Sequence, residues 1–232
     1  DVYKRQVSAL LKKSNIETGL PFSFVRYRME RLHVHGWDRT GCVSENFLGP
    51  GQSLITVNRL LSNFLGVPLK QKLAQLSSDK KRVAFLAEAV AEYTGLDKFP
   101  QYLTLLFEVD ALFCNDDRHL NNIAVIEQEG RYSYCPIFDN GAGLLSNTRL
   151  LQMDIDPEPL VSSLRARPFQ TTFTRQRNAA RSLTGKQLVL PRLTAEQIRE
   201  TVRPLLEYYP ARDRDGIMQR VSACILIRQK AV

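Results

Sequence analysis

Hydrophobic residues recur at intervals of three and four positions along two stretches in the first half of the chain. One stretch runs from Leu54 to Phe64 and the other from Val83 to Ala91, with Ser78 and Asp79 in front of the second. This spacing is typical of amphipathic helices, and a Ser or Asp before such a run is a common N-cap. We therefore predict two helices, each with one face packed against the core.

A third stretch, Leu103 to Cys114, is apolar almost throughout, which predicts a buried helix. Glu108 and Asp110 interrupt this stretch. A buried carboxylate is costly without a partner, so both side chains need a cation or hydrogen-bond donors if they face inward. A shorter helical pattern spans Val7 to Lys13.

The end of the chain is also predicted to be helical. Thr194 and Gln197 form a capping-box pattern for a helix that reaches about Tyr208, and Gly216 to Ile227 has the pattern of a final amphipathic helix. Residues 143–168 contain Asp and Pro residues that should break helices. We expect a loop there, where an activation or substrate-binding segment would lie.

Strand patterns occur in two pairs. Phe22 to Val34 and Thr40 to Phe47 flank the turn residues His35 to Asp38, and Ile123 to Ile126 and Tyr132 to Phe138 flank a turn that contains Gly. Together with the helices, these two hairpins predict an α+β fold that is mostly helical.

The net charge of +8 is concentrated at one end of the chain. Residues 161–232 hold 14 of the 32 Lys and Arg residues but 5 of the 24 Asp and Glu residues. A basic helical end can attract phosphate, nucleic acid or an acidic protein, although a solvated helix face is the simpler interpretation. No basic-aromatic repeat, zinc-finger or helix-turn-helix pattern is visible, so direct nucleic-acid binding is not expected.

A hydrophobic content of 44% and a charged content of 24% are ordinary for a globular protein. No apolar run approaches the roughly 18 residues of a membrane span, and no signal-peptide pattern is visible. We therefore expect no membrane association and a cytoplasmic location. The cysteines are far apart in the sequence and are expected to be reduced thiols rather than a zinc site or a disulfide framework: Cys42, Cys114, Cys135 and Cys224.

The candidate chemistry lies around the second hairpin. Asp117 is followed five residues later by Asn122, and the two predicted strands separate Asn122 from Asp139. If these strands pair, Asn122 at the start of the first and Asp139 at the end of the second become neighbours. Their oxygens suit Mg²⁺, which takes one or two carboxylates and completes its shell with water and nucleotide phosphates. Asp117 precedes the hairpin and is placed to orient an acceptor hydroxyl as a base.

An Asp and an Asn at this spacing are by themselves common in loops, where they cap turns. However, the string DDRHLNNIAVI (Asp116 to Ile126) and the later FDNG (Phe138 to Gly141) resemble the catalytic loop and metal aspartate of HipA-like serine/threonine kinases. Phosphoinositide kinases have a similar order, whereas ordinary protein kinases place the His before the Asp. The segments Gly41 to Leu48 and Ala166 to Gln176 also resemble HipA-like proteins, so the resemblance covers roughly residues 20–182. Asn140 stands where protein kinases have Phe, and no Phe switch is expected.

The resemblance implies a protein-kinase-like fold and a phosphotransferase that uses ATP and Mg²⁺. By position, the family's roles fall on Asp117 as catalytic base, His119 as a catalytic-loop residue near the phosphates, and Asn122 and Asp139 as metal and nucleotide ligands. Val43 and Ser44, in the Gly41 to Leu48 segment, are expected beside the nucleotide.

Two elements that a kinase needs are missing from the pattern. No Gly-rich loop precedes the first strands, and Lys12 and Lys13 lie in a helical pattern rather than on a strand. Residues 1–6 (DVYKRQ) look like translated sequencing-adaptor sequence and are left out of the fold. We therefore expect the C-terminal part of a longer kinase, with 7–49 as a small-lobe remnant, 50–232 as the helical lobe, and little activity from this chain alone.

The phosphate acceptor is expected to be a Ser or Thr hydroxyl of a protein, on the resemblance alone. The family, known from bacterial toxin–antitoxin systems, also suggests a DNA-binding, antitoxin-like partner. A lipid or small-molecule kinase of the same fold stays open, since a phosphate-bearing substrate suits the basic end, although no amphipathic membrane helix is apparent. A pseudokinase or regulatory binding module is the other alternative, and the complete set of Asp117, Asn122 and Asp139 argues against it.

Overall fold

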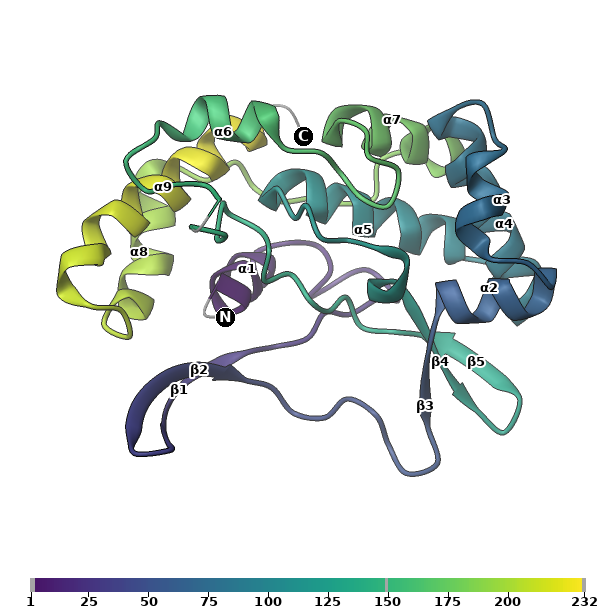
Figure 1. Ribbon diagram of the computed structural model, residues 1–232, viewed down its shortest axis with the longest axis horizontal. Coiled ribbons are helices and arrows are strands. Elements are labelled where there is room, and N and C mark those ends of the chain that lie inside the picture. Colours follow the sequence, from purple (N-terminus) through teal and green to yellow (C-terminus); the bar gives the residue numbers. More distant parts are fainter. Residues whose placement is uncertain (1–2, 149, 231–232) are drawn as a thin grey trace.

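The computed structural model describes residues 3–148 and 150–230. In this part of the chain, helices form the bulk of the molecule, and two small antiparallel sheets lie along one side of it (Figure 1). The α+β class predicted from the sequence is therefore confirmed. None of the helices in these residues is long and apolar enough to cross a membrane.

The elements have the following bounds: α1 (Tyr3–Leu11), β1 (Arg28–Val34), β2 (Trp37–Val43), β3 (Ser53–Thr56), α2 (Val57–Leu65), α3 (Leu69–Ala74), α4 (Asp79–Thr94), α5 (Phe99–Phe113), the single 3₁₀ turn η1 (Leu120–Asn122), β4 (Ala124–Gln128), β5 (Arg131–Tyr134), α6 (Pro157–Ser163), α7 (Phe173–Thr184), α8 (Ala195–Leu206) and α9 (Ala211–Gln229).

Helix α5 is the centre of the fold. Every residue from Tyr102 to Phe113 is buried, and α4, α7 and α9 pack around it. The apolar run predicted this helix, which begins four residues earlier than expected. Pro100 lies in its first turn, where a helix tolerates the missing N–H because that group would have no partner within the helix.

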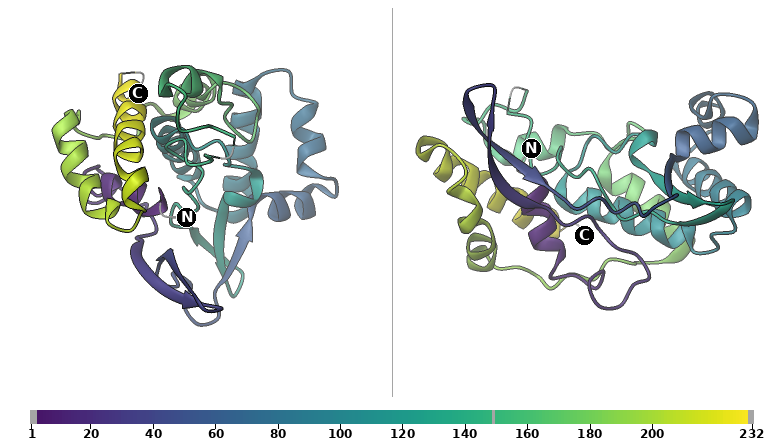
Figure 2. Two further views of the ribbon diagram at one scale, coloured as in Figure 1. Left: turned by 60° about the vertical axis from the view of Figure 1, so that its left-hand side comes forward. Right: turned by 90° about the horizontal axis from the view of Figure 1, so that it is seen from below.

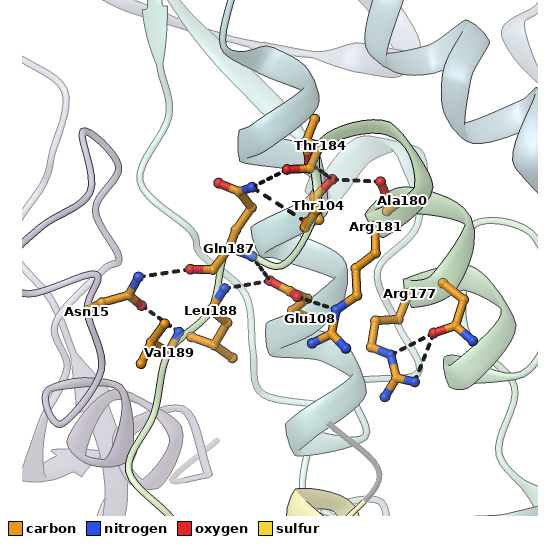
Figure 3. A network of polar contacts seen from close by, with 12 residues as sticks. Asn15, Thr104, Glu108, Arg177, Ala180, Arg181, Thr184, Gln187, Leu188 and Val189 are labelled. Carbon is orange, nitrogen blue, oxygen red and sulfur yellow. Dashed lines mark hydrogen bonds and ion pairs between the residues drawn. The ribbon is translucent and has the colours of Figure 1, made fainter.

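Glu108 ties α5 to the segment that follows α7 (Figure 3). Its side chain is fully buried, and it accepts hydrogen bonds from Arg181 Nε at 2.5 Å and from the backbone N–H groups of Gln187 and Leu188 at 3.0 and 2.6 Å. Asn15 bonds to the same segment, so the N-terminal region is held to it as well. The expected partners of this buried carboxylate are thus present.

Both predicted hairpins form, but the strand bounds differ: β1 and β5 are shorter than expected, whereas β2 already begins at Trp37 and β4 continues to Gln128. In β1–β2 the turn is His35-Gly36, and in β4–β5 it is Glu129-Gly130; all four residues have positive φ, between 50° and 78°. Two-residue turns with two positive φ angles suit the right-handed twist of a hairpin. Strand β3 adds to the other side of β4, giving the order β3-β4-β5.

Three sequence predictions are corrected by the structure. Leu54, expected to begin a helix, lies in β3 and pairs with Ile126, because the helix starts only after its N-cap Thr56. Residues 143–168, expected to be a loop, contain α6, since the Asp156 side chain caps the helix and a proline is well tolerated at its first position. Residues 3–6, left out of the fold, belong to α1, in which Tyr3 is buried; residues 1 and 2 lie outside the described residues.

The main core extends across the expected boundary at residue 49. It contains Val7 and Leu10 from α1 and Phe22 from the segment after it, together with the centres of α4, α5, α7 and α9. The β1–β2 hairpin extends away from this core, as Figure 2 shows, and exposes 68% of Trp37. Its strands meet the connection between α8 and α9, where Thr40 Oγ1 donates to the Tyr208 carbonyl at 3.1 Å.

Candidate functional site

The candidate site begins where α5 ends. Cys114 adopts a left-handed conformation with φ of 54° and caps the helix, because its N–H bonds to the carbonyl of Asp110. The chain then passes through a short loop and the turn η1 into β4. The most buried helix of the fold therefore delivers the loop that carries Asp117 and Asn122.

Arg118 holds this loop together from inside. Its guanidinium is fully buried, with Nε and Nη2 each 3.0 Å from an oxygen of Asp110. It also donates to the carbonyls of Asn122 and Phe138 at 3.0 and 2.7 Å and to Oδ1 of Asn140 at 2.5 Å. One side chain thus fixes α5, the loop and the end of the hairpin relative to one another, and Asp110 has the cationic partner that its burial required.

Asp110 remains in an unfavourable environment for a carboxylate despite these contacts. Burial raises the pKa of Asp110, and the charge and hydrogen bonds of Arg118 oppose that rise. Asn115 Nδ2 adds a further hydrogen bond to Asp110 Oδ1 at 2.9 Å. The cluster is therefore well bonded but depends on Arg118.

The structure brings Asn122 and Asp139 together, although neither lies in a strand: Asn122 ends η1, and Asp139 follows the end of β5 at Tyr134 by five residues. Asn122 Nδ2 lies 2.8 Å from Asp139 Oδ2 and 3.1 Å from the carbonyl oxygen of Asp117. Asp139 has φ of 54°. Its second oxygen, Oδ1, lies 2.9 Å from Lys4 Nζ, so the carboxylate is a cation site in this structure. Lys4 lies in α1, so this ion pair joins the first helix to the segment after β5.

Two oxygen ligands from this pair fit Mg²⁺ when phosphates and water supply the rest of the shell. The amide nitrogen of Asn122 donates to both Asp139 and the Asp117 carbonyl; rotation of the amide by half a turn would present the oxygen to a metal ion and would replace both hydrogen bonds. Among the described residues, no cluster of three or more His, Cys, Asp or Glu side chains could hold a metal by itself. Asp139 and Asn122 could therefore supply two oxygen ligands to a metal ion, with the remaining ligands coming from outside this pair.

Asp117 is half-exposed and forms an ion pair that the sequence did not predict. Arg167 Nη1 lies 2.7 Å from Asp117 Oδ1. Burial raises the pKa of the neighbouring Asp116, the charge of Asp117 raises it further, and Arg167 opposes both. Arg167 lies in a segment that carries part of the resemblance, but no spacing rule connects it to Asp117, 50 residues away.

His119 is half-buried in the loop. Its backbone N–H donates to the Asp117 carbonyl at 2.8 Å, and its ring Nδ1 is buried with no hydrogen-bond partner among the described residues. The backbone hydrogen bond ties His119 to Asp117.

Val43 and Ser44 lie in another part of the site, at a hollow of about 600 Å³. Residues 23–28 form one wall, because Phe24 bridges to Ile137 in the strand-like segment before Asp139. Phe47 lines the hollow and packs against Phe138, with ring centroids 6.3 Å apart. The hollow is therefore connected to Asp139 through one pair of rings. Four of its lining residues are basic and one, Glu45, is acidic; the basic residues are Arg5, Lys12, Arg26 and Arg28.

Comparisons of the chain with protein-family models, with curated proteins and with solved structures found no match. The resemblance to HipA-like kinases therefore rests on the quoted motifs, and the function rests on these motifs and the geometry of the site.

Proposed function

We propose that this protein is an ATP- and Mg²⁺-dependent phosphotransferase of protein-kinase-like fold, similar to HipA-like serine/threonine kinases. The observation that carries the proposal is the contact of 2.8 Å between the side chains of Asn122 and Asp139, with Asn122 also donating to the backbone carbonyl of Asp117. Kinase-type transfer needs this combination of metal ligands and an orienting carboxylate.

In this proposal each group has a separate task. Asp139 and Asn122 hold the metal ion, which when bound neutralises charge on the nucleotide phosphates. Asp117 orients the acceptor hydroxyl and takes its proton. Arg118 is too deeply buried to meet a substrate and acts by fixing the positions of the other three. The hollow beside Val43 and Ser44 has room for the base and ribose, and its basic residues favour an anionic ligand.

The nature of the acceptor is inferred from the resemblance alone. The resemblance implies that the acceptor is a Ser or Thr hydroxyl of a protein. It also implies that the protein is cytoplasmic and has a DNA-binding, antitoxin-like partner. None of these three inferences is needed for the nucleotide site, so they can be tested separately from it.

Nucleotide binding tests the proposal most directly. Isothermal titration calorimetry with ATP, in Mg²⁺ and in EDTA, should show binding that requires the metal. A bound nucleotide should also raise the melting temperature, because a ligand held only by the folded state stabilises it by mass action. Asp139→Asn should abolish the metal-dependent binding, whereas Asp117→Asn should preserve it. Asp215→Asn, at an exposed position of α9, is the matched control.

The results separate the roles clearly. In a form of the protein that transfers phosphate, Asp117→Asn should lower turnover by roughly two or more orders of magnitude, the usual scale of acid–base catalysis. Equal loss of ATP affinity in the Asp117 and Asp139 variants would contradict the division of roles. No metal-dependent nucleotide binding by the unmutated chain would overturn the proposed function.

A further inference from the structure

Phosphoryl transfer needs positive charge beside the transferred group, in addition to the metal ion. The loop that carries Asp117 contains one arginine, Arg118, whose side chain is fully buried and bonded to Asp110 and to backbone carbonyls. That guanidinium cannot reach a phosphate without dismantling the loop. A cation for the transferred group therefore has to come from another element.

Arg167 is such a cation. Its Nη1 lies 2.7 Å from Asp117 Oδ1, and both side chains are 45% exposed, so a ligand can reach the pair from solvent. Exposed ion pairs contribute only about 0–1 kcal/mol, so Arg167 can share its contact with a phosphate at little cost.

The backbone beneath Arg167 is firmly held. The buried Ala166 exchanges two backbone hydrogen bonds with Thr171, at 2.7 and 3.3 Å, and Gln176 Nε2 donates to the Arg167 carbonyl at 2.8 Å. The ring of Phe169 packs edge-on against α5. The segment is thus anchored to α5 and α7, while the guanidinium extends to Asp117.

Contacts lead from Arg167 to the metal ligands through adjacent residues. Arg167 bonds to the Asp117 carboxylate, the Asp117 carbonyl accepts from Asn122, and Asn122 contacts Asp139. Arg167 and Asn122 therefore contact the same residue, Arg167 through the carboxylate of Asp117 and Asn122 through its backbone carbonyl.

We infer that Arg167 binds the transferred γ-phosphoryl group of ATP while it holds Asp117 toward the acceptor; this role rests on the function proposed above. In the transfer, the bond between the γ-phosphorus and the bridging oxygen breaks, and its electron pair leaves with ADP. The acceptor oxygen forms the new bond to phosphorus, and Asp117 takes the hydroxyl proton. Arg167 transfers no proton and neutralises the phosphoryl oxygens.

A comparison of ATP with ADP tests this role without requiring turnover. Affinities are measured by calorimetry in Mg²⁺ for the unmutated chain, Arg167→Ala and Arg167→Lys. Arg167→Ala should weaken ATP binding about tenfold or more, the scale of a hydrogen bond to a charged group, and leave ADP binding unchanged. Arg167→Lys keeps the charge but not the planar fork, so part of the ATP affinity should return.

Arg165→Ala is the matched control, because this exposed arginine lies two residues away and bonds to neighbouring backbone carbonyls. Equal effects on ATP and ADP, or no effect on either, would overturn the role of Arg167 and leave the proposed function intact. A gain in ATP affinity would also overturn it and would make Arg167 a residue that blocks the site. If the unmutated chain binds neither nucleotide in Mg²⁺, the proposed function and this role fail together. Circular dichroism verifies that each variant folds. If Arg167→Ala does not fold, the ATP and ADP affinities of Arg167→Lys are compared with those of the unmutated chain instead.

Discussion

Replacing Arg118 with Met should destabilise the protein strongly. The guanidinium is fully buried and bonds to both oxygens of Asp110, to Asn140 and to two backbone carbonyls. Met fills much of the same space but donates no hydrogen bond, so Asp110 becomes a buried carboxylate without a cation. Removing one partner of a buried ion pair costs about 3–5 kcal/mol. In a protein of this size, that loss lowers the melting temperature by about 6–20 °C.

The stability lost in Arg118→Met should increase as the pH rises. Burial already raises the pKa of Asp110, and removal of Arg118 takes away the group that opposes this rise. A carboxyl whose pKa is higher in the folded state contributes stability at low pH, and this contribution is lost as the pH rises through the folded-state pKa. Arg118→Met should therefore be less impaired at about pH 5 than at about pH 8. Adding Asp110→Asn to Arg118→Met removes the buried charge and should recover part of the lost stability at the higher pH.

Unfolding in guanidinium chloride, followed by far-UV circular dichroism, measures these differences. The fluorescence of Trp37 is a poor probe, because this residue lies on the exposed β1–β2 hairpin. Arg165→Met is the control and should change stability by no more than about 0.5 kcal/mol, as exposed substitutions usually do. A loss below about 1 kcal/mol for Arg118→Met would refute the reasoning, since it would mean that the buried pair contributes no more than an exposed one. A double variant less stable than Arg118→Met at about pH 8 would refute the assigned role of Asp110.

Three further results are expected. Cys42 should react first with a thiol reagent, because the other cysteines are buried and burial raises the pKa of Cys135 to about 12; mass spectrometry of partly labelled protein identifies the site. Glu108→Gln should lower the free energy of unfolding by about 1–3 kcal/mol, because the NH₂ group of the new amide would face another donor, either Arg181 or the two backbone N–H groups. An unchanged midpoint of denaturant unfolding would contradict this. Thr194→Ala should cost about 1 kcal/mol and speed amide exchange in the first turn of α8, since it removes the cap.

The closeness of Asn122 and Asp139 could be predicted because it depends on local structure. Two short apolar runs joined by a Gly turn favour a hairpin, which brings the segments before β4 and after β5 to the same end. Beyond the last pair, Val125 with Tyr134, Arg118 holds these segments by donating to the carbonyls of Asn122 and Phe138. The need of Glu108 and Asp110 for partners was equally visible, since charges in an apolar helix must be compensated. Their partners were not visible: Arg181 lies 73 residues after Glu108 in the chain.

The position of Arg167 could not be predicted from the sequence, because the contact spans 50 residues and depends on how the segment before α7 is anchored. Strand β3 was missed for a similar reason. Leu54 fits a helical spacing with the residues after Thr56, and only pairing with β4 makes it a strand. Local spacing cannot distinguish these outcomes, since β pairing is decided by a distant partner.

The sequence by itself determined the α+β class, the buried helix α5, the hairpin beside it and the residue types at the candidate site, because hydrophobic periodicity and turn residues act over short distances. Only the tertiary structure decided which cation meets which carboxylate: Arg118 inside with Asp110, and Arg167 outside with Asp117. As far as the sequence shows, any arginine could pair with any carboxylate. The packing of α5 and α7 decides which of them meet. Burial makes the first pair structural, and exposure leaves the second open to a ligand.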